Sequence, residues 1–403
     1  MSLARPASPP PETHRPLASS GGPERGPEAR RVVVRSIAGE ERAALLAWLD
    51  AGLRPGRPGR LEAELPVELS PESAADHVVA TSEGRLLAHA FGRLVNAHAR
   101  GIHVPVGLIG LVYTDPEARG RGLASRCVEQ CVASLSRRGA MLVALWSDLE
   151  DFYARLGFHP GGRDALYVMD RTVCLEARRV LGARLEVGPL EPREVPEVEA
   201  LHSARAIGAE REAGVLASRL TAPGCTTVVA RRDGRPVATA TLGRGDDFPD
   251  VVHEWAGESA GVLGCLEWLS RSRDALGLLS GPLDAGILRA LRSAGAAVHP
   301  RPFALLRITD PEALWRRLSV GRTALAARTL RAEGERLVLG HRRARPGPHR
   351  LGGEWSMSHP EALDLLFGSG PGPAPPACLT REERSDLEQA LPWPLFLWGF
   401  DSI

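Results

Sequence analysis

Hydrophobic and polar positions along the chain follow two periodicities, and the changes between them mark successive strands and helices. The β-branched run at residues 32–34 precedes a periodic apolar stretch at 43–49, which predicts a strand followed by a helix. Two alternating runs at 77–80 and 85–90 are joined by Ser82-Glu83-Gly84. This junction predicts a hairpin in which glycine supplies the unusual backbone angle.

A nearly continuous apolar run at 106–113 predicts the next strand. Behind it, the spacing of apolar residues predicts a helix at 122–138, a strand at 141–146 and a short helix at 150–156. Together with the elements before them, these segments complete one unit of alternating strands and helices.

A second unit with the same order of elements begins near Leu185. The pattern predicts a strand at 185–187, a helix at 195–206, a hairpin with arms at 226–230 and 236–242, a strand at 251–255 and a helix at 261–270. Asp233-Gly234 is the expected turn of that hairpin. The repeated order indicates a degenerate internal duplication.

The composition shifts again after Pro300-Arg301-Pro302, where a third unit is expected. Residues 303–308 predict a strand, and Asp310-Pro311-Glu312 and Ser358-His359-Pro360-Glu361 each carry a helix-start signal. The Gly/Pro-rich stretch at 368–376 is expected to be a loop. Residues 393–403 are strongly aromatic and apolar, which predicts that the end of the chain is packed against the protein.

Charge and cysteine usage exclude several classes of protein. The 403 residues carry a formal net charge of +1, so we expect neither nucleic acid nor an anionic membrane as a partner. All 50 basic residues are arginine, so Schiff-base chemistry through lysine is excluded. Residues 1–30 lack an apolar core and predict a disordered tail, neither a signal peptide nor a membrane span.

Six cysteines in a chain of this length are too sparse for a disulfide framework, so a reduced, cytoplasmic protein is expected. Cys127 and Cys131 lie one helical turn apart and could suggest a metal pair. No second Cys or His pair follows at zinc-site spacing, so we interpret both as small buried residues and expect no metal.

The segment from Val112 to Ala124 holds the most informative pattern in the chain. A strand that ends in a turn delivers Arg119-Gly120-Arg121-Gly122-Leu123-Ala124 to the start of a helix. Such a junction aims backbone N–H groups and the positive end of the helix dipole at one point, and an anionic phosphate is what that point binds. The alternative is a plain strand–turn–helix connection with glycines chosen for the turn.

This segment resembles motif A of the GNAT superfamily of N-acetyltransferases, whose signature is [Arg/Gln]-x-x-Gly-x-[Gly/Ala]. The run Asp151-Phe152-Tyr153-Ala154-Arg155-Leu156-Gly157-Phe158, further along, resembles motif B of the same family. The resemblance covers residues 31–175 and implies an α+β fold with a splayed, mixed and mostly antiparallel sheet flanked by helices. It also implies acetyl-CoA as co-substrate, held along Leu111, Val112, Tyr113 and Thr114 and by the backbone of Arg119–Ala124.

Tyr153 is the side chain that we expect to take part in the chemistry. A phenol within hydrogen-bond range can protonate or stabilise the departing CoA thiolate, and family members with tyrosine here use it so. The alternative is an aromatic filler between helix and sheet. No carboxylate lies at 106–113, so His103, Asp148, Glu150 and Asp151 are the local candidates for a general base, each of which could equally be a solvated loop residue.

The layout of the whole chain resembles the enhanced intracellular survival (Eis) acetyltransferases. The resemblance implies a GNAT domain at 31–175, a degenerate second GNAT-like domain at 181–300 and a sterol-carrier-like α+β domain at 301–403. In that family the terminal α-carboxylate acts as the base, a role that falls here on Ile403. The second unit has Trp255-Ala256-Gly257-Glu258-Ser259-Ala260-Gly261 where the phosphate loop would be, and it should not bind CoA.

These observations predict a cytoplasmic N-acetyltransferase that moves an acetyl group from acetyl-CoA to a primary amine by direct attack. The acceptor would be a small polyamine or aminoglycoside-like molecule, or a peptide amine. The resemblance also implies a homo-oligomer. Two alternatives remain: a non-catalytic sensor that binds acyl-CoA or lipid, and protein acetylation within an assembly.

Overall fold

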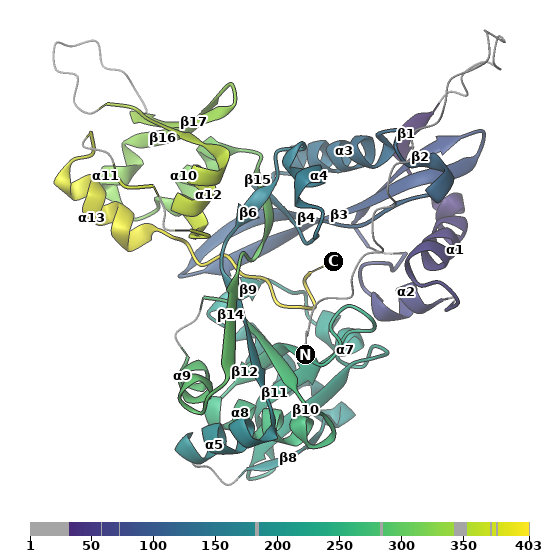
Figure 1. Ribbon diagram of the computed structural model, residues 1–403, viewed down its shortest axis with the longest axis vertical. Helices are drawn as coiled ribbons and strands as arrows, with labels where there is room; N and C mark the ends of the chain where they lie inside the picture. The colour runs from purple at the N-terminus through teal and green to yellow at the C-terminus, as the bar shows by residue number, and fades with distance from the viewer. Residues whose placement is uncertain are drawn as a thin grey trace, which may run out of the picture.

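The computed structural model describes residues 32–57, 59–71, 73–181, 185–282, 285–341, 353–370, 373–375 and 378–402 (Figure 1). The tail predicted at 1–30, part of the loop predicted at 368–376 and the terminal Ile403 lie outside the described residues.

An eight-stranded sheet carries the first unit, in the order β1-β2-β3-β4-β5-β15-β6, with β9 paired to β3. Neighbouring strands are antiparallel except β4 and β5, which are parallel. The strands are β1 (Val33–Ser36), β2 (Asp76–Ser82), β3 (Arg85–Ala99), β4 (Ile102–Thr114), β5 (Leu142–Leu145), β6 (His159–Gly161), β9 (Ile207–Ala209) and β15 (Ala304–Ile308).

Helices cover both faces of this sheet, because successive apolar residues along its strands point to opposite faces. Val78 and Ala80 pack in one cluster with helix α3, whereas Val79 and Phe91 pack in another with α1 and α2. The predicted mixed, mostly antiparallel sheet flanked by helices is therefore confirmed. The helices of this unit are η1 (Gly39–Glu41), α1 (Arg42–Leu53), α2 (Arg60–Glu64), η2 (Pro116–Ala118), α3 (Leu123–Arg137) and α4 (Glu150–Ala154).

A second sheet of seven strands follows, in the order β14-β7-β13-β12-β11-β10-β8. Its strands are β7 (Asp164–Met169), β8 (Glu186–Pro189), β10 (Thr226–Arg232), β11 (Arg235–Leu242), β12 (Val251–Gly257), β13 (Leu276–Ser280) and β14 (Ala297–Arg301). Its helices are α5 (Arg171–Leu181), η3 (Pro192–Glu194), α6 (Val195–Ser203), α7 (Val215–Leu220), α8 (Ser259–Leu269), η4 (Ser270–Ser272) and α9 (Gly286–Ser293).

The two sheets exchange strands. Strand β7 precedes the second unit in sequence but pairs with β13 and β14 in the second sheet. Strand β15 follows the second unit but pairs with β5 and β6 in the first sheet. The strand at 303–308 is thus confirmed as a strand, while it completes the first sheet rather than starting a separate third one.

A small three-stranded sheet and four helices follow in the described part of the remaining chain. These elements are β16 (Arg328–Glu333), β17 (Arg336–His341), β18 (Trp355–Ser358), α10 (Pro311–Leu318), α11 (Thr323–Ala326), α12 (His359–Phe367) and α13 (Arg381–Ala390). Both predicted helix starts are confirmed, since the side chains of Asp310 and Ser358 accept hydrogen bonds from the N–H groups of Ala313 and Glu361. The likeness of this part to sterol carriers stays a prediction.

The chain returns from α13 to the middle of the molecule through residues 393–402, here called the C-terminal segment. It runs between the two large sheets (Figure 1, yellow). Trp393, Phe396, Trp398 and Phe400 are almost completely buried there. The expected packing of the chain end is confirmed through Ser402.

The described cysteines and helices give two further observations. All six cysteines are unpaired, and Cys127 and Cys131 are buried on α3, as interpreted from their spacing. Within the described ranges, no helix has both the length and the apolar character needed to cross a membrane.

Candidate active site

The first sheet opens between β4 and β5. The two strands pair in parallel from Val106 to Leu108, opposite Leu142 to Ala144. Strand β4 then continues to Thr114 without β5 beside it. The edge of β4 beyond Leu108 therefore faces a gap of the kind that an extended ligand can enter as an additional strand.

A bulge lies in this free part of β4. The register with β3 shifts between His89 and Phe91, and Leu111 has a φ angle of 48°. A leucine in the left-handed region costs about 1–2 kcal/mol relative to its ordinary conformations. Contacts around Leu111 must therefore hold the bulge in place.

The direction of the backbone groups follows from one hydrogen bond. The Asp115 N–H donates to the Leu87 carbonyl on β3, at 2.9 Å. Since these groups alternate along a strand, Tyr113 also turns its N–H and C=O toward β3, where it lies opposite His89. Val112 and Thr114 therefore direct theirs toward the opening, whereas the sequence prediction took all of 111–114 together.

The loop after β4 leads directly into α3. Gly120 and Gly122 have φ angles of 74° and 69°, and a Cβ atom built on either one would meet nothing within 4 Å. Gly122 is the residue before the first turn of α3, which begins at Leu123 and Ala124. Free N–H groups of a helix start thus border open space on a loop of two left-handed glycines.

Charges beside this loop favour an anion. Arg119 and Arg121 are exposed on it. The acids Asp115 and Glu117 are both bound by Arg85, at 3.1 and 2.7 Å. The Asp115 carboxylate accepts a hydrogen bond from the Glu117 N–H, and this bond lowers the pKa of Asp115 below its usual value. Arg85 therefore pairs with both acids.

Tyr153 lies on α4 and is buried in the same apolar cluster as Leu123, with Val112 packed against it. Its ring meets Phe152 edge-on at 4.8 Å and Phe158 at 6.0 Å. Burial raises the pKa of its hydroxyl to about 12, so the group stays protonated at neutral pH. The structure thus brings Tyr153, the free strand edge and the glycine loop around one cluster.

Leu111 and Tyr113 direct their side chains to the opposite face of the sheet, against α1. The Tyr113 ring packs edge-on against Trp48 at 4.8 Å. It also covers Gly52, where a Cβ would approach the ring to 2.2 Å. These two residues support β4 from behind, and only their main chains border the gap.

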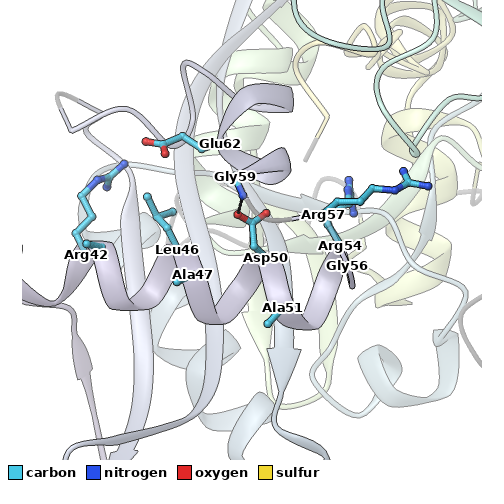
Figure 2. Close-up of a pocket in the computed structure, with 11 residues that line it drawn as sticks. Arg42, Leu46, Ala47, Asp50, Ala51, Arg54, Gly56, Arg57, Gly59 and Glu62 are labelled. Atoms are coloured by element: carbon cyan, nitrogen blue, oxygen red, sulfur yellow. Dashed lines mark hydrogen bonds between the residues drawn. The ribbon is translucent and has the colours of Figure 1, made fainter.

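A groove of about 590 Å³ lies along α1 and α2 and contains none of the predicted site residues. Figure 2 shows its single deeply buried acid, Asp50, pointing at the start of α2. The Asp50 carboxylate accepts from the N–H groups of Gly59 and Leu61 at 2.6 and 2.8 Å. It caps α2 and is not free to act as a base.

The C-terminal segment is held by buried ion pairs. Asp401 binds Arg211 at 2.8 Å and Arg219 at 3.3 Å, and Glu254 on β12 binds Arg211 and Arg205 at 2.6 and 2.7 Å. Arg211, through its charge and its hydrogen bond, holds the pKa of Asp401 below its usual range despite burial. Asp401 is therefore ionised at neutral pH and holds the C-terminal segment through its paired arginines.

Two further arginines bind the main chain of the C-terminal segment at Asp401 and Ser402. Arg93 on β3 donates to the Asp401 carbonyl at 3.1 Å, and Arg244 donates to the Ser402 carbonyl at 2.7 Å. Arg93 lies opposite Leu108 of β4, only three residues before the bulge, or about 10 Å along the strand. Sequence reasoning did not single out these arginines, because nothing in the local pattern sets them apart from the other arginines.

The local candidates for a base lie elsewhere. His103 is near the start of β4 and pairs with Glu210 at 2.7 Å. It is eight residues from Leu111, so the strand places it about 26 Å from the bulge. Asp148, Glu150 and Asp151 are exposed where α4 begins. None of the four contacts the C-terminal segment among the described hydrogen bonds and ion pairs.

The second sheet has a comparable gap, which is filled by side chains of the sheet and by the C-terminal segment. Strands β12 and β13 part after Val252, and the Trp255 indole N–H donates across to the Leu279 carbonyl at 3.0 Å. Trp398 packs edge-on against Trp255 at 5.1 Å, and the Phe400 N–H donates to a buried carboxylate of β12 at 2.9 Å. The C-terminal segment lies where an extended ligand would have to enter.

Four buried histidines predict sensitivity to acid. Burial lowers the pKa of His77 and His253 to about 4 and that of His89 and His202 to about 3. The unfolded chain binds their protons near pH 6.5, so their contribution to stability is full above that pH. It is lost as the pH falls from about 6.5 toward 4.

We expect the free energy of unfolding to fall by up to about 5 kcal/mol per pH unit near pH 5, because unfolding then takes up as many protons as there are such histidines. Thermal unfolding followed between pH 4 and 8 at constant ionic strength measures this slope. A melting temperature that stays constant from pH 6.5 to 5 would contradict the neutral state of these side chains.

Comparison with known proteins agrees with this geometry. Residues 39–161 match the model of the GNAT acetyltransferase domain. No curated protein sequence matches the chain.

Solved structures provide the second comparison. The GCN5-related N-acetyltransferase from Anabaena variabilis aligns with a TM-score of 0.59 at 14% identity, over 91% of this chain and 98% of its own. A protein from Enterococcus faecalis, described as a probable N-acyltransferase, aligns with a TM-score of 0.58 at 16% identity, over 71% and 75%. Eis1 from Mycobacterium abscessus aligns with 0.49 at 16% identity, over 76% and 78%.

The first two alignments show a shared fold, and the domain match covers the opening, the glycine loop and Tyr153. The chain therefore carries a GNAT acetyltransferase domain at residues 39–161.

Proposed function

We propose that the protein transfers an acetyl group from acetyl-CoA to a primary amine by direct attack. The observation that carries this proposal is the opening of the sheet beside β4, which leads straight into the glycine loop at the start of α3. A pantetheine arm needs an unpaired strand edge, and a pyrophosphate needs convergent N–H groups. Both occur here in the order in which acetyl-CoA presents them.

Main-chain groups and the open space at the glycine loop support this co-substrate. Val112 and Thr114 offer main-chain groups to the amides of pantetheine. The backbone from Arg119 to Ala124 surrounds the pyrophosphate, and the open space at Gly120 and Gly122 admits it. Acetyl-CoA supplies the activated thioester, and the protein supplies orientation and proton transfer.

The reaction then needs one acid and one base. The amine nitrogen bonds to the acyl carbon and the carbon–sulfur bond breaks. The departing thiolate takes a proton from the Tyr153 hydroxyl, and the amine loses a proton to a base. We propose the α-carboxylate of Ile403 for that base, since Asp401, two residues before it, is bound by Arg93, which lies opposite Leu108 of β4.

Turnover tests the proposal. Purified protein is incubated with acetyl-CoA and a panel of polyamines, aminoglycosides and peptides, and free CoA thiol is measured with the acetylated product. Release of thiol that depends on one class of amine supports the proposal. Binding of acetyl-CoA without turnover on any amine would favour the sensor alternative.

Three further features belong to the same proposal. The second unit binds no CoA, because its gap holds the C-terminal segment and its loop lacks an arginine. Residues 301–403 act as a sterol-carrier-like domain, except for strand β15, which belongs to the first sheet. The protein works as a cytoplasmic homo-oligomer, which sedimentation analysis tests directly.

Replacing Tyr153 by Phe should lower kcat by roughly ten- to a thousandfold, because packing is kept and only the proton donor is lost. The affinity for acetyl-CoA, measured by calorimetry, should change little. Tyr167→Phe is the matched control, since it removes a buried hydroxyl that contacts Arg292 in the second unit. An unchanged kcat in Tyr153→Phe would make this residue a packing residue.

A further inference from the structure

Two buried histidines connect β2 and β3 to the bulge of β4. The Nδ1 atom of His77 lies 3.1 Å from Nε2 of His89, and Nδ1 of His89 lies 2.8 Å from the Leu111 carbonyl oxygen. His89 is fully buried and His77 is 6% exposed. A continuous chain of hydrogen bonds thus ends on the one residue of β4 that has a positive φ angle.

The chemistry of the partners fixes both tautomers. A carbonyl oxygen can only accept, so Nδ1 of His89 must carry the proton. Both rings are neutral, because burial lowers the pKa of each well below 6.5. Nε2 of His89 therefore accepts from Nδ1–H of His77. Nε2 of His77 therefore carries no proton. It is buried without a hydrogen-bond partner among the described residues.

The carbonyl that His89 binds belongs to the peptide unit between Leu111 and Val112. In a trans peptide the N–H points opposite to the C=O. The bond from His89 therefore fixes the direction in which the Val112 N–H points, which is away from the histidines. It also polarises the peptide unit, because a hydrogen bond at the oxygen strengthens the donor at the nitrogen.

We infer that His89, oriented by His77, is a positioning residue for acyl-CoA: it holds the Leu111 bulge and aims the Val112 N–H at the bound ligand. The inference rests on the proposed function, in which acyl-CoA lies along the free edge of β4. No proton leaves either histidine during the reaction. The pair acts through the main chain, and it offsets the cost of a left-handed leucine at this position.

Three variants separate this role from simple packing. His89→Asn keeps an N–H donor close to the position of Nδ1, although it loses the ring volume. His89→Leu keeps more of the volume and removes the donor. Phe91→Leu is the matched control, because Phe91 is equally buried on the same face of β3 and packs against His77 at 5.3 Å but has no hydrogen-bond donor for the Leu111 carbonyl.

Calorimetry with acetyl-CoA provides the primary measurement. We expect the Kd to rise about tenfold in His89→Leu, which is the effect of one lost hydrogen bond. It should rise less than about threefold in His89→Asn, and Phe91→Leu should lower the melting temperature with the Kd unchanged. A role in packing alone predicts the reverse order, with Asn worse than Leu, because Asn leaves the larger cavity.

The outcomes distinguish this inference from the proposed function. If the unaltered protein binds no acetyl-CoA, both the proposed function and this inference are wrong. If the unaltered protein binds and His89→Leu binds equally well, only the inference is overturned. Melting temperatures of all variants identify any that fail to fold. If His89→Leu fails to fold, the steady-state KM for acetyl-CoA of the folded His89→Asn decides: a rise of less than about threefold at unchanged kcat supports the positioning role, and a larger rise overturns it.

Discussion

A Gly122→Val variant should lose affinity for acetyl-CoA by at least about a hundredfold. Gly122 has a φ angle of 69° at the start of α3, and its missing side chain faces open space. Valine would strain the backbone, since a β-branched residue strongly disfavours the left-handed region. Its methyl groups would also occupy the position where the phosphate must approach the N–H groups. Calorimetry with acetyl-CoA measures the loss.

A matched control variant tests whether backbone strain alone explains the loss of affinity. Gly234 also has a positive φ angle, 76°, with nothing near a built Cβ, and it lies in the β10–β11 turn of the second unit. Gly234→Val should therefore destabilise the protein to a similar extent while acetyl-CoA still binds. Wild-type affinity in Gly122→Val, or equal loss in both variants, would show that the glycine loop is not the phosphate site.

Local signals in the sequence predict the elements around the opening well. The turn at Glu83-Gly84, the glycines before α3 and the N-cap residues of α10 and α12 each act over a few residues, so their effect can be read from the chain. The periodicity at 122–138 agrees with α3 to within one residue at each end. The family match covers the same segments.

Long-range pairing could not be predicted in the same way. Strand β3 extends to Ala99, beyond the expected 85–90, because Arg93 and His98 face other parts of the chain instead of solvent. The exchange of β7 and β15 depends on which sheet edge is free, and apolar periodicity carries no such information. The partners of His89 are likewise set by the strand register alone.

The end of the chain is the other place where a large effect is expected. Extending the protein by Gly-Ser-Gly after Ile403 should reduce acetyl transfer by at least about a hundredfold, in the range for a displaced general base. Every native side chain remains, and only the α-carboxylate moves. Deleting Ser402 and Ile403 should have a similar effect. Turnover with the amine identified in the acceptor panel is the measurement, together with acetyl-CoA affinity and melting temperature.

Most of the anchors remain in these variants, so both should still fold and bind acetyl-CoA. Asp401, Trp398 and Phe400 keep their contacts in both variants, while the deletion removes the Arg244 hydrogen bond to the Ser402 carbonyl. An α-carboxylate has an ordinary pKa of about 3.5, so it is ionised at neutral pH and can accept a proton directly or through water. The same three residues added at the N-terminus serve as the control. If the C-terminal extension turns over at the rate of the unaltered protein, Ile403 is not the base. His103 and the exposed acids near Tyr153, at the start of α4, then become the candidates.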